Sequence, residues 1–499
     1  MISFNLLNIN NYYSRIDSSA FEDLGIKSLF DDFYDSNWNA LEDVMSKICD
    51  AKEIQNRQDI FTDFLNDNEN KLGILKRLLT EVWERYKNYQ HSDGGLIHYV
   101  NFYLYQKALI SFIREGFDIL QSLDLKSEKM INMKESLKSI IDSEIFIALN
   151  SNVAGAENAY NSIRTFIVSY KMNEDNIKIN KINEKKSVYL FDELKSCSDM
   201  LGIDLPTYAT NTLRHPLDSY YFNRLEYIFT EEVQTLKDFY ETFNDKIEID
   251  YEILYRDLNY YLRFKELFIY AKEKDVLYSK ATINDEYVTN ISDMKDITII
   301  NKVPEITAND FTYTKDHHIQ IVTGANGGGK TTFLRSIGAN YIIFSALGYT
   351  FSAAAAIKPV KFIKTHFPND ENYHVGYGRL EDEIMRLKDI QKSFCEDCLF
   401  LSNETFSSTD EDTAFKESKM LFDEIEEKQV NMIFITHQQK IINYINKDKV
   451  ILLNPIVDTE HGNKRTFKIK PVKNKIHAFA QDILRKYGLA KDQLEKSEE

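Results

Sequence analysis

Residues 323–336 read TGANGGGKTTFLRS and hold three consecutive glycines, in a chain with only 17 glycines among 499 residues. The segment from Gly324 to Thr331 fits the pattern G-x-x-x-x-G-K-[ST] of a phosphate-binding loop. An apolar stretch, HIQIV, precedes the loop, and a helical pattern, TTFLRSIGANYIIF, follows it. Strand, loop and helix stand in the order that this motif requires, so the sequence predicts a nucleotide-binding loop.

The chemistry of a triphosphate explains this composition. Its oxygens need several backbone N–H groups that point into one concavity, and glycine reaches the positive φ values that turn them inward without placing a Cβ in the way. The N-terminus of the following helix adds partial positive charge. We expect Lys330 to reach the β- and γ-phosphates and Thr331 to ligate Mg²⁺.

The next apolar strand, CLFLSNETF, ends in Asn403 and Glu404. Nucleotide hydrolases usually carry Asp-Glu at this place, where the Asp helps to hold Mg²⁺ and the Glu orients or deprotonates the attacking water. Glu404 keeps the expected catalytic role. Asn403 offers a neutral amide oxygen instead of a carboxylate, which predicts weaker Mg²⁺ affinity, slower hydrolysis, or both.

A further apolar run, NMIFIT, ends in Thr436 and is followed by His437. A single histidine at a strand end is usually structural. Its place after Glu404 is equally compatible with an imidazole that senses the γ-phosphate.

Up to about Lys280 the apolar pattern is helical. KLGILKRLLTEVWERY places Leu75, Leu78, Leu79 and Val82 on one helix face. The same spacing recurs in residues 251–275, which are rich in aromatic side chains. A base-stacking platform is one interpretation of these aromatics. Their helical spacing favours the other interpretation, a helix core.

After about Val288 the pattern changes to short β-branched runs, which are ITII (297–300), IQIV (319–322), CLFLSN (398–403), NMIFIT (431–436) and KVILL (449–453). Strands that alternate with helices predict a largely parallel sheet covered on both faces. We therefore expect a mainly α-helical domain at residues 1–287 and an α/β P-loop ATPase domain at residues 288–499, with a helical tail from Ile476.

Composition limits the class of protein. The charge balance is 61 basic against 78 acidic residues, net −17, which argues against a generally basic nucleic-acid coat. Four cysteines in so long a chain are no disulfide framework and indicate a reducing compartment. Cys395 and Cys398 form a C-x-x-C without a second pair, so we interpret them as small buried residues at a helix-to-strand junction rather than as metal ligands. Without a signal-like N-terminus or about 18 apolar residues in a row, we expect a cytoplasmic protein with no membrane segment.

Several segments together resemble the MutS family, the ATPases of DNA mismatch repair and their relatives. TGANGGGKTTFLRSIG is similar to the family's T-G-P-N-x-x-G-K-S-T, SNETFSSTDEDTA to its D-E-x-x-x-G-T-S-x-x-D-G-x-A, and FITH to its A-T-H. AKEIQNRQDIFTDFL, from Ala51, resembles the helix that opens the family's core domain. The segment from Lys464 to the C-terminus resembles the family's closing strand and helix, and ANDF, from Ala308, resembles the segment near the adenine.

The resemblance implies a helical core and lever domain followed by an ABC-type ATPase domain. It also implies a MutS-like ATPase that hydrolyses ATP with Mg²⁺ to drive a clamp on DNA, as a homodimer in which each ATPase domain closes over the other's nucleotide. The residues that it assigns are Glu404 and His437 for catalysis, Thr331 and Asn403 for the metal, and Asn309, Gly324, Asn326, Gly327, Gly328, Gly329, Lys330, Thr331 and Thr332 for the nucleotide.

Three departures from the family pattern matter. The core-like segment begins within the first 60 residues, so we expect no mismatch-reading or connector domain and no mismatch preference. Asn403 replaces the metal-binding Asp. In VGYGRLEDEIMRL, Glu383 matches the family Glu, but Gly378 replaces a Ser that reaches the partner subunit's γ-phosphate, a role for which Arg379 offers a guanidinium.

Asn403 and Gly378 support an alternative of a different class, a nucleotide-gated binding module with negligible hydrolysis that acts on DNA or on a protein partner. A clamp ATPase of the ABC or SMC type is a second alternative. The lack of an L-S-G-G-Q-like segment before Glu404 and the MutS-like C-terminal segment argue against it.

Overall fold

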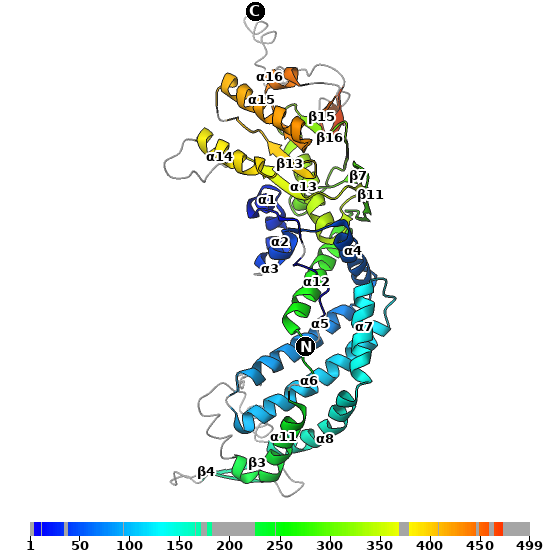
Figure 1. The fold of residues 1–499 in the computed structure, drawn as a ribbon, viewed down its shortest axis with the longest axis vertical. Coiled ribbons are helices and arrows are strands. Elements are labelled where there is room, and N and C mark those ends of the chain that lie inside the picture. The colour runs from blue at the N-terminus through cyan, green and yellow to red at the C-terminus, as the bar shows by residue number, and fades with distance from the viewer. Residues whose placement is uncertain are drawn as a thin grey trace, which may run out of the picture. The chain divides into compact units, whose positions relative to one another are not determined.

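The structure is a computed structural model that describes residues 4–10, 12–33, 38–92, 94–164, 166–170, 177–181, 225–244, 246–368, 379–407, 409–445, 449–458 and 464–472. A mainly helical N-terminal half precedes a mixed α/β region with a parallel sheet (Figure 1). The chain divides into two compact units, a helical unit of Met1–Asn5 and Asp67–Asn259, and a sheet unit of Leu6–Asn66 and Tyr260–Glu499. The tail from Ile476 and Gly378 lie outside the described residues.

The division into units differs from the predicted domain boundary between residues 287 and 288, which stays a prediction. Helix α4 (Ala51–Asn66) belongs to the sheet unit because it packs on helix α13 (Lys330–Leu347). Gln58 of α4 donates to the carbonyls of Gly348 at 2.5 Å and Ala281 at 2.7 Å. These contacts join an early segment of the chain to the part that carries the phosphate-binding motif.

The helical unit is built from α5 (Lys71–Gln90), α6 (Gly95–Gln121), α7 (Glu128–Ile141), α8 (Glu144–Arg164), α11 (Thr230–Phe243), the first part of α12 (Tyr251–Glu273), and an antiparallel pair of strands, β3 (Phe166–Tyr170) and β4 (Ile177–Lys181). Asp67 accepts hydrogen bonds from the first two amides of α5 at 2.9 Å, which satisfies groups that a helix start leaves unpaired. The predicted face of α5 is confirmed, with Leu75, Leu79 and Val82 buried and Leu78 half-buried.

The aromatic residues of α12 are core, as predicted. Tyr260, Tyr261 and Phe264 are buried, and Tyr255 is half-buried. The hydroxyl of Tyr260 donates to the carbonyl of Ala346 at 3.2 Å. These side chains stabilise packing and do not form a base-stacking platform.

The main sheet has the strand order β12-β13-β14-β9-β15-β16. Its strands are β12 (Phe362–His366), β13 (Cys398–Asn403), β14 (Asn431–Ile435), β9 (Ile319–Val322), β15 (Val450–Asp458) and β16 (Lys464–Pro471). All neighbours pair in parallel except β16, which is antiparallel to β15. The strands predicted at residues 319, 398, 431 and 449 are thus confirmed.

Helices cover both faces of this sheet, as predicted. Phe400, Met432 and Phe434 pack in one core cluster with apolar residues of α15 (Glu411–Lys428). On the other face, Gly338 of α13 lies so near the side chain of Leu401 that a Cβ there would be 2.7 Å from Leu401 Cδ1. Burial on both faces explains why β13 and β14 read as continuous apolar runs in the sequence.

The strand predicted at residues 297–300 is wrong. Ile297–Ile299 form a 3₁₀ turn, η1, because the carboxylate of Asp296 accepts hydrogen bonds from the amide of Thr298 at 3.0 Å and from its hydroxyl at 2.6 Å. Asp, Ser, Asn and Thr side chains compete for backbone groups in this way and favour turns over strands.

The remaining elements of the sheet unit are short. They are β1 (Ser14–Arg15), α1 (Ser18–Asp23), α2 (Ile26–Phe33), α3 (Trp38–Met45), β2 (Lys47–Ile48), β5 (Ser279–Lys280), β6 (Thr282–Ile283), β7 (Val288–Met294), β8 (Asn309–Thr314), β10 (Tyr349–Thr350), β11 (Ala354–Ile357), α14 (Arg379–Gln391) and α16 (Gln439–Tyr444). Strands β6, β11, β7 and β8 form a second sheet. Within the described ranges, no helix has the length and apolar character that crossing a membrane requires.

Candidate nucleotide-binding site

The phosphate-binding motif forms the connection between β9 and α13, at the carboxyl end of β9. Gly324, Gly327 and Gly329 have φ angles of +120°, +71° and +90°, a region that favours glycine. Asn326 and Gly327 are exposed, whereas Gly324 and Gly328 are buried. The loop therefore adopts the glycine-dependent backbone that the motif predicts, directly before a helix N-terminus.

Lys330 lies inside this loop. Its ammonium group donates to the carbonyls of Gly324 at 2.9 Å and Ala325 at 3.2 Å, and to Oδ1 of Asn326 at 3.3 Å. Burial lowers the pKa of Lys330, and the charge of Glu404 opposes that shift. The ammonium group is thus held at the centre of the loop by neutral oxygen acceptors.

Glu404 and His437 meet beside the loop. His437 Nε2 lies 2.9 Å from Asn326 Oδ1 and 3.3 Å from Glu404 Oε1. Both neighbours are acceptors, so the arrangement assigns a proton to Nε2. The hydrogen bond from His437 is the main cause that lowers the pKa of Glu404. The carboxylate is therefore ionised at neutral pH.

Three adjacent strands bring these groups together. Glu404 directly follows β13, and its amide donates to the carbonyl of Ile435 at the end of β14 at 2.9 Å. Thr436 follows β14, and its amide donates to the carbonyl of Val322 at the end of β9 at 3.1 Å. The carboxyl ends of neighbouring parallel strands meet at one edge, which is where α/β sheets bind ligands.

Asn403, the last residue of β13, carries a buried Oδ1 atom without a hydrogen-bond partner in the described part of the chain. Leaving such an oxygen unsatisfied costs about 1–3 kcal/mol. Thr331 lies in the first turn of α13, half-buried. A hydroxyl and an amide oxygen suit Mg²⁺, which takes oxygen ligands and binds through few protein groups plus substrate phosphates. Within the described ranges, no cluster of three His, Cys, Asp or Glu residues offers a different metal site.

A hydrogen-bonded support behind Glu404 was not predicted. The hydroxyls of Ser402 and Thr405 bond each other, and His366 Nδ1 lies 2.8 Å from the hydroxyl of Thr405. Glu383, which the family resemblance singled out, accepts from the amide of Phe406 at 2.7 Å. These contacts fix the turn that carries Glu404. The position of His366 at the end of β12 was the signal available in the sequence.

Asn309 is bound to strand β16. Its Nδ2 donates to the carbonyl of Phe467 at 3.1 Å, and its Oδ1 accepts from the amide of Ile469 at 2.7 Å. The assignment of Asn309 to the adenine stays a prediction. These two bonds use one of the two N–H donors of the amide and one of the two acceptor sites of its oxygen. Thr332 is half-buried in the first turn of α13, and its role stays a prediction too. The side chain of Arg379 lies outside the described residues.

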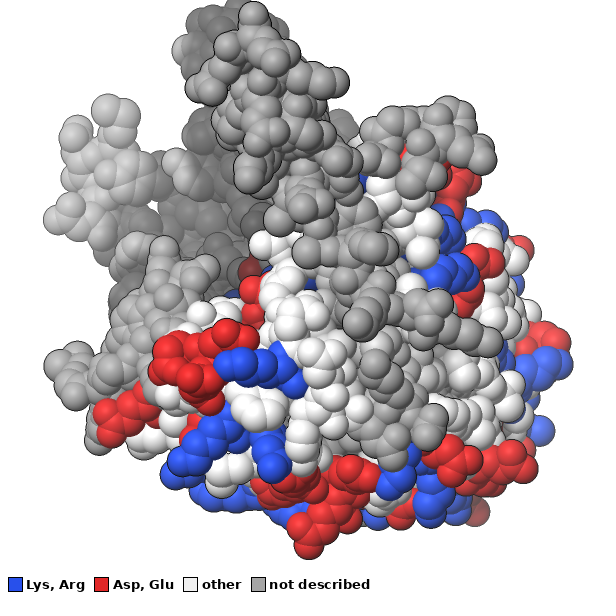
Figure 2. All heavy atoms as spheres, turned by 90° about the horizontal axis from the view of Figure 1, so that it is seen from above, with Lys and Arg blue, Asp and Glu red and all other residues white. Residues whose placement is uncertain are grey.

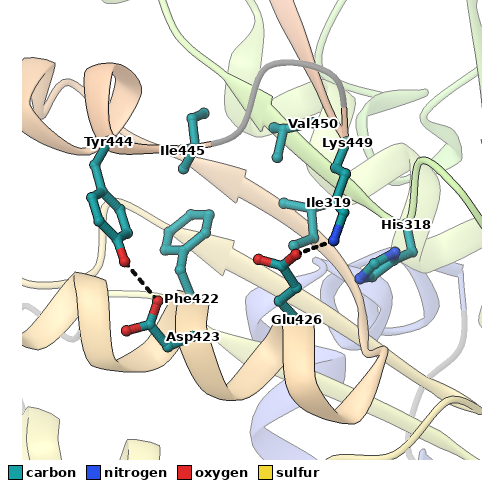
Figure 3. A pocket seen from close by; sticks show the side chains of 9 residues that line it. All are labelled: His318, Ile319, Phe422, Asp423, Glu426, Tyr444, Ile445, Lys449 and Val450. Atoms are coloured by element: carbon teal, nitrogen blue, oxygen red, sulfur yellow. Dashed lines mark hydrogen bonds and ion pairs between the residues drawn. The ribbon is translucent and has the colours of Figure 1, made fainter.

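The structure also contains a pocket of about 200 Å³ away from the loop (Figure 3). It lies at the amino ends of β9 and β15, because Ile319 and Val450 are the first residues of those strands. The lining residues are His318, Ile319, Phe422, Asp423, Glu426, Tyr444, Ile445, Lys449 and Val450. Four of its polar side chains form two pairs, Tyr444 with Asp423 and Lys449 with Glu426. The pocket is thus at the opposite end of the strands from the phosphate-binding loop.

Comparisons with known proteins give distant similarities. No protein-family profile matches the chain. Over 384 residues, 76% of the chain, it is 19% identical to an endonuclease MutS2 of Bacillus cytotoxicus. Over 199 residues, 39% of the chain, it is 24% identical to an endonuclease MutS2 of a Geobacillus species. Over 126 residues, 25% of the chain, it is 24% identical to a mitochondrial DNA mismatch repair protein mutS homolog of Sarcophyton glaucum.

The chain spans less than half the length of the curated relatives it matches, because the matched segments cover 46%, 25% and 13% of those proteins. The similarity nevertheless extends over much of this chain. The chain is therefore a distant relative of the MutS family.

Proposed function

We propose that this protein is a MutS-like ATPase that binds and hydrolyses ATP with Mg²⁺ to drive a conformational clamp on DNA. The observation that carries the proposal is the meeting of Lys330, Glu404 and His437 around Asn326 at one edge of the parallel sheet. A phosphate-binding loop, an ionised carboxylate and an imidazole are the groups that phosphoryl transfer to water uses.

Binding begins with the loop. Its backbone N–H groups and the N-terminus of α13 attract the phosphates, and Lys330 exchanges its three oxygen partners for phosphate oxygens. Thr331 and Asn403 would hold Mg²⁺, which neutralises phosphate charge when it is bound.

Glu404 then acts on water. Its carboxylate is ionised and partly exposed, so it accepts a hydrogen bond from the attacking water and takes up a proton from it. The water oxygen bonds to the γ-phosphorus while the bond from that phosphorus to the bridging oxygen breaks, and ADP leaves with the electron pair of that bond. His437 positions this carboxylate through Nε2 and links it to Asn326 of the loop. Loop occupancy and the position of the base are coupled through this imidazole.

Two substitutions test the proposal. Lys330→Ala should abolish ATP binding, because the loop loses its cation. Glu404→Gln should retain ATP binding and lose phosphate release. Lys449→Ala and Glu426→Gln are matched controls, since this ion pair lies at the opposite end of the strands. Isothermal titration calorimetry measures binding, and a phosphate-release assay measures turnover. Turnover at the parent rate by Glu404→Gln would show that the catalytic assignment is wrong.

A second candidate function is a nucleotide-gated binding module with negligible hydrolysis. The neutral amide of Asn403 favours it, because the site has one carboxylate fewer for the metal. Both candidates bind ATP, so phosphate release in the parent protein separates them. Release above the level of Lys330→Ala supports the ATPase, and release at that level supports the binding module.

DNA as the partner is a proposal that rests on the relatives, one of which carries DNA mismatch repair in its name. The net charge of −17 does not favour it. Figure 2 shows Lys and Arg interspersed with Asp and Glu over the described part of one face, rather than gathered in a broad basic area. Salt-dependent binding to duplex, branched or mismatched DNA tests the proposal, since phosphate contacts weaken steeply with salt. Absence of DNA binding at low salt would favour a protein partner over DNA.

A further inference from the structure

The hairpin of β15 and β16 packs against the phosphate-binding loop. Pro455 of β15 lies over two loop glycines, since a Cβ on Gly324 would be 2.9 Å from Pro455 Cδ and a Cβ on Gly328 would be 2.8 Å from Pro455 Cγ. Phe467 of β16 lies over Gly329, where a Cβ would be 3.4 Å from Phe467 Cδ1. Glycine at these positions therefore has two effects. It permits the backbone angles of the loop, and it allows the hairpin to pack closely against the loop.

Arg465 of β16 is the charged member of this contact. A Cβ on Gly327 would lie 2.4 Å from one terminal nitrogen of Arg465 and 3.1 Å from its Cζ, so the guanidinium group rests directly on the loop backbone. Gly327 is one of the two exposed positions of the loop. The guanidinium group thus lies at an exposed part of the phosphate-binding loop.

Two other cations of β16, Lys468 and Lys470, are used differently. Lys470 pairs with Asp310 at 2.9 Å, and Lys468 donates to the carbonyl of Ala308. Arg465 forms no ion pair with a carboxylate in the part of the chain that the structure describes. A guanidinium group that has no carboxylate partner among the described residues, and that lies on the loop before a helix N-terminus, is suited to bind an anion there.

A nucleotide triphosphate would supply such an anion. Its phosphates carry several negative charges, and the planar guanidinium group binds phosphate oxygens through two parallel hydrogen bonds. Asn403 is neutral, so the site lacks the carboxylate that would help to hold Mg²⁺ at the end of β13. A guanidinium group near the phosphates is therefore needed more. Protein cations then take a larger share in neutralising the phosphates.

We propose that Arg465 contacts the phosphates of the nucleotide bound to its own chain, as a second cation beside Lys330. This inference rests on the proposed function, since it requires a nucleotide in the loop. It assigns to the β15–β16 hairpin a part in nucleotide binding.

Titration calorimetry with ATP and Mg²⁺ tests the inference on four full-length proteins, the parent, Arg465→Ala, Arg465→Lys and Lys470→Ala. Arg465→Ala should weaken ATP binding by about tenfold or more, the loss expected for a charge-assisted hydrogen bond. Arg465→Lys should recover part of the affinity. Lys470→Ala, on the same strand but paired with Asp310, should bind like the parent. Because Arg465 is exposed, the thermal unfolding of its variants should match that of the parent.

The outcomes separate the two proposals. Parent-like ATP affinity in Arg465→Ala, together with loss of binding in Lys330→Ala, would overturn the inference and leave the proposed function intact. Tighter ATP binding in Arg465→Ala would also overturn it, because the arginine would then obstruct the loop. No ATP binding by the parent at millimolar ATP would refute the proposed function itself, and the inference with it.

Discussion

Asn403 is the residue at which this site departs most clearly from a standard nucleotide hydrolase. Its buried Oδ1 has no hydrogen-bond partner among the described residues and stands next to Glu404. Asn403→Asp should lower the Mg²⁺ concentration for half-maximal phosphate release by about tenfold, because ligand charge strongly tunes the affinity of divalent cations. Without Mg²⁺ the same substitution should weaken ATP binding, since two carboxylates would then face the phosphates. An unchanged Mg²⁺ dependence would remove Asn403 from the metal site.

His437 offers a second test at this scale. His437→Ala removes the hydrogen bonds to Asn326 and Glu404, so phosphate release should fall by roughly a hundredfold, within the range for groups that position a base, while ATP still binds. His437→Gln keeps an N–H donor, so its phosphate release should fall less. If both variants release phosphate at the parent rate, His437 is structural.

Because of His366, we expect the folded protein to lose stability in acid. Burial lowers the pKa of His366 to about 4, whereas an unfolded histidine has a pKa near 6.5. Between these values the unfolded chain takes up a proton that the folded chain does not. The contribution of His366 to the free energy of unfolding is therefore fully present above pH 6.5. The free energy of unfolding then falls by about 3 kcal/mol as the pH falls towards 4.

Urea unfolding measures this effect. Trp38 lies in the sheet unit and Trp83 in the helical unit, so Trp83→Phe leaves Trp38, the chain's other tryptophan, to report on the sheet unit. In that background His366→Gln should flatten the decline in stability between pH 6.5 and 4. His317→Gln, a half-buried histidine of the same unit, is the control. An equal decline in the parent and in His366→Gln would contradict the assignment.

At the scale of elements, α13 connects the phosphate-binding loop to the packing of α4. The helix begins at Lys330 and ends before Gly348, which has a φ angle of +71° and whose carbonyl accepts from Gln58. A Cβ on Gly348 would lie 2.5 Å from Gln58 Cβ. Gly348→Ala should therefore destabilise the protein by about 2–3 kcal/mol, from backbone strain and overpacking together.

Thermal unfolding followed by circular dichroism measures this loss. Gly155→Ala is the matched control, because Gly155 is helical and an added Cβ would meet no atom within 4 Å. That control should be neutral or stabilising by up to about 1 kcal/mol. Equal unfolding temperatures for both variants would show that the α4–α13 contact adapts without cost.

Elements were predictable from the sequence where burial on both faces left a continuous apolar run, as in β13 and β14. The conformation of the phosphate-binding loop was predictable because the spacing of its glycines and Lys330 follows from what a phosphate group requires. The turn at Ile297–Ile299 was not, since one Asp side chain decides it. The contact of Arg465 with Gly327 was not either, because it depends on how β15 and β16 pair and pack, and no local pattern encodes that.

At the scale of the whole molecule, the prediction concerns self-association. The resemblance to MutS implies two chains, each closing over the other's nucleotide, and a ligand shifts such an equilibrium only by its preference for the closed state. We expect light scattering after gel filtration to report a larger dimer fraction with ATP and Mg²⁺ than without. Glu404→Gln should increase that fraction, because bound ATP is not consumed.

The net charge of the chain adds a salt dependence to this prediction. Two copies of a chain with net charge −17 repel each other at low ionic strength, and salt near 0.15 M screens that repulsion beyond about 8 Å. The ATP-dependent dimer should therefore be more populated at 0.15 M salt than at about 0.02 M. Lys330→Ala should show the same small dimer fraction with and without ATP. A strictly monomeric mass for the parent and for Glu404→Gln, under all of these conditions, would exclude a clamp built from two such chains, whereas nucleotide binding by each chain alone would remain.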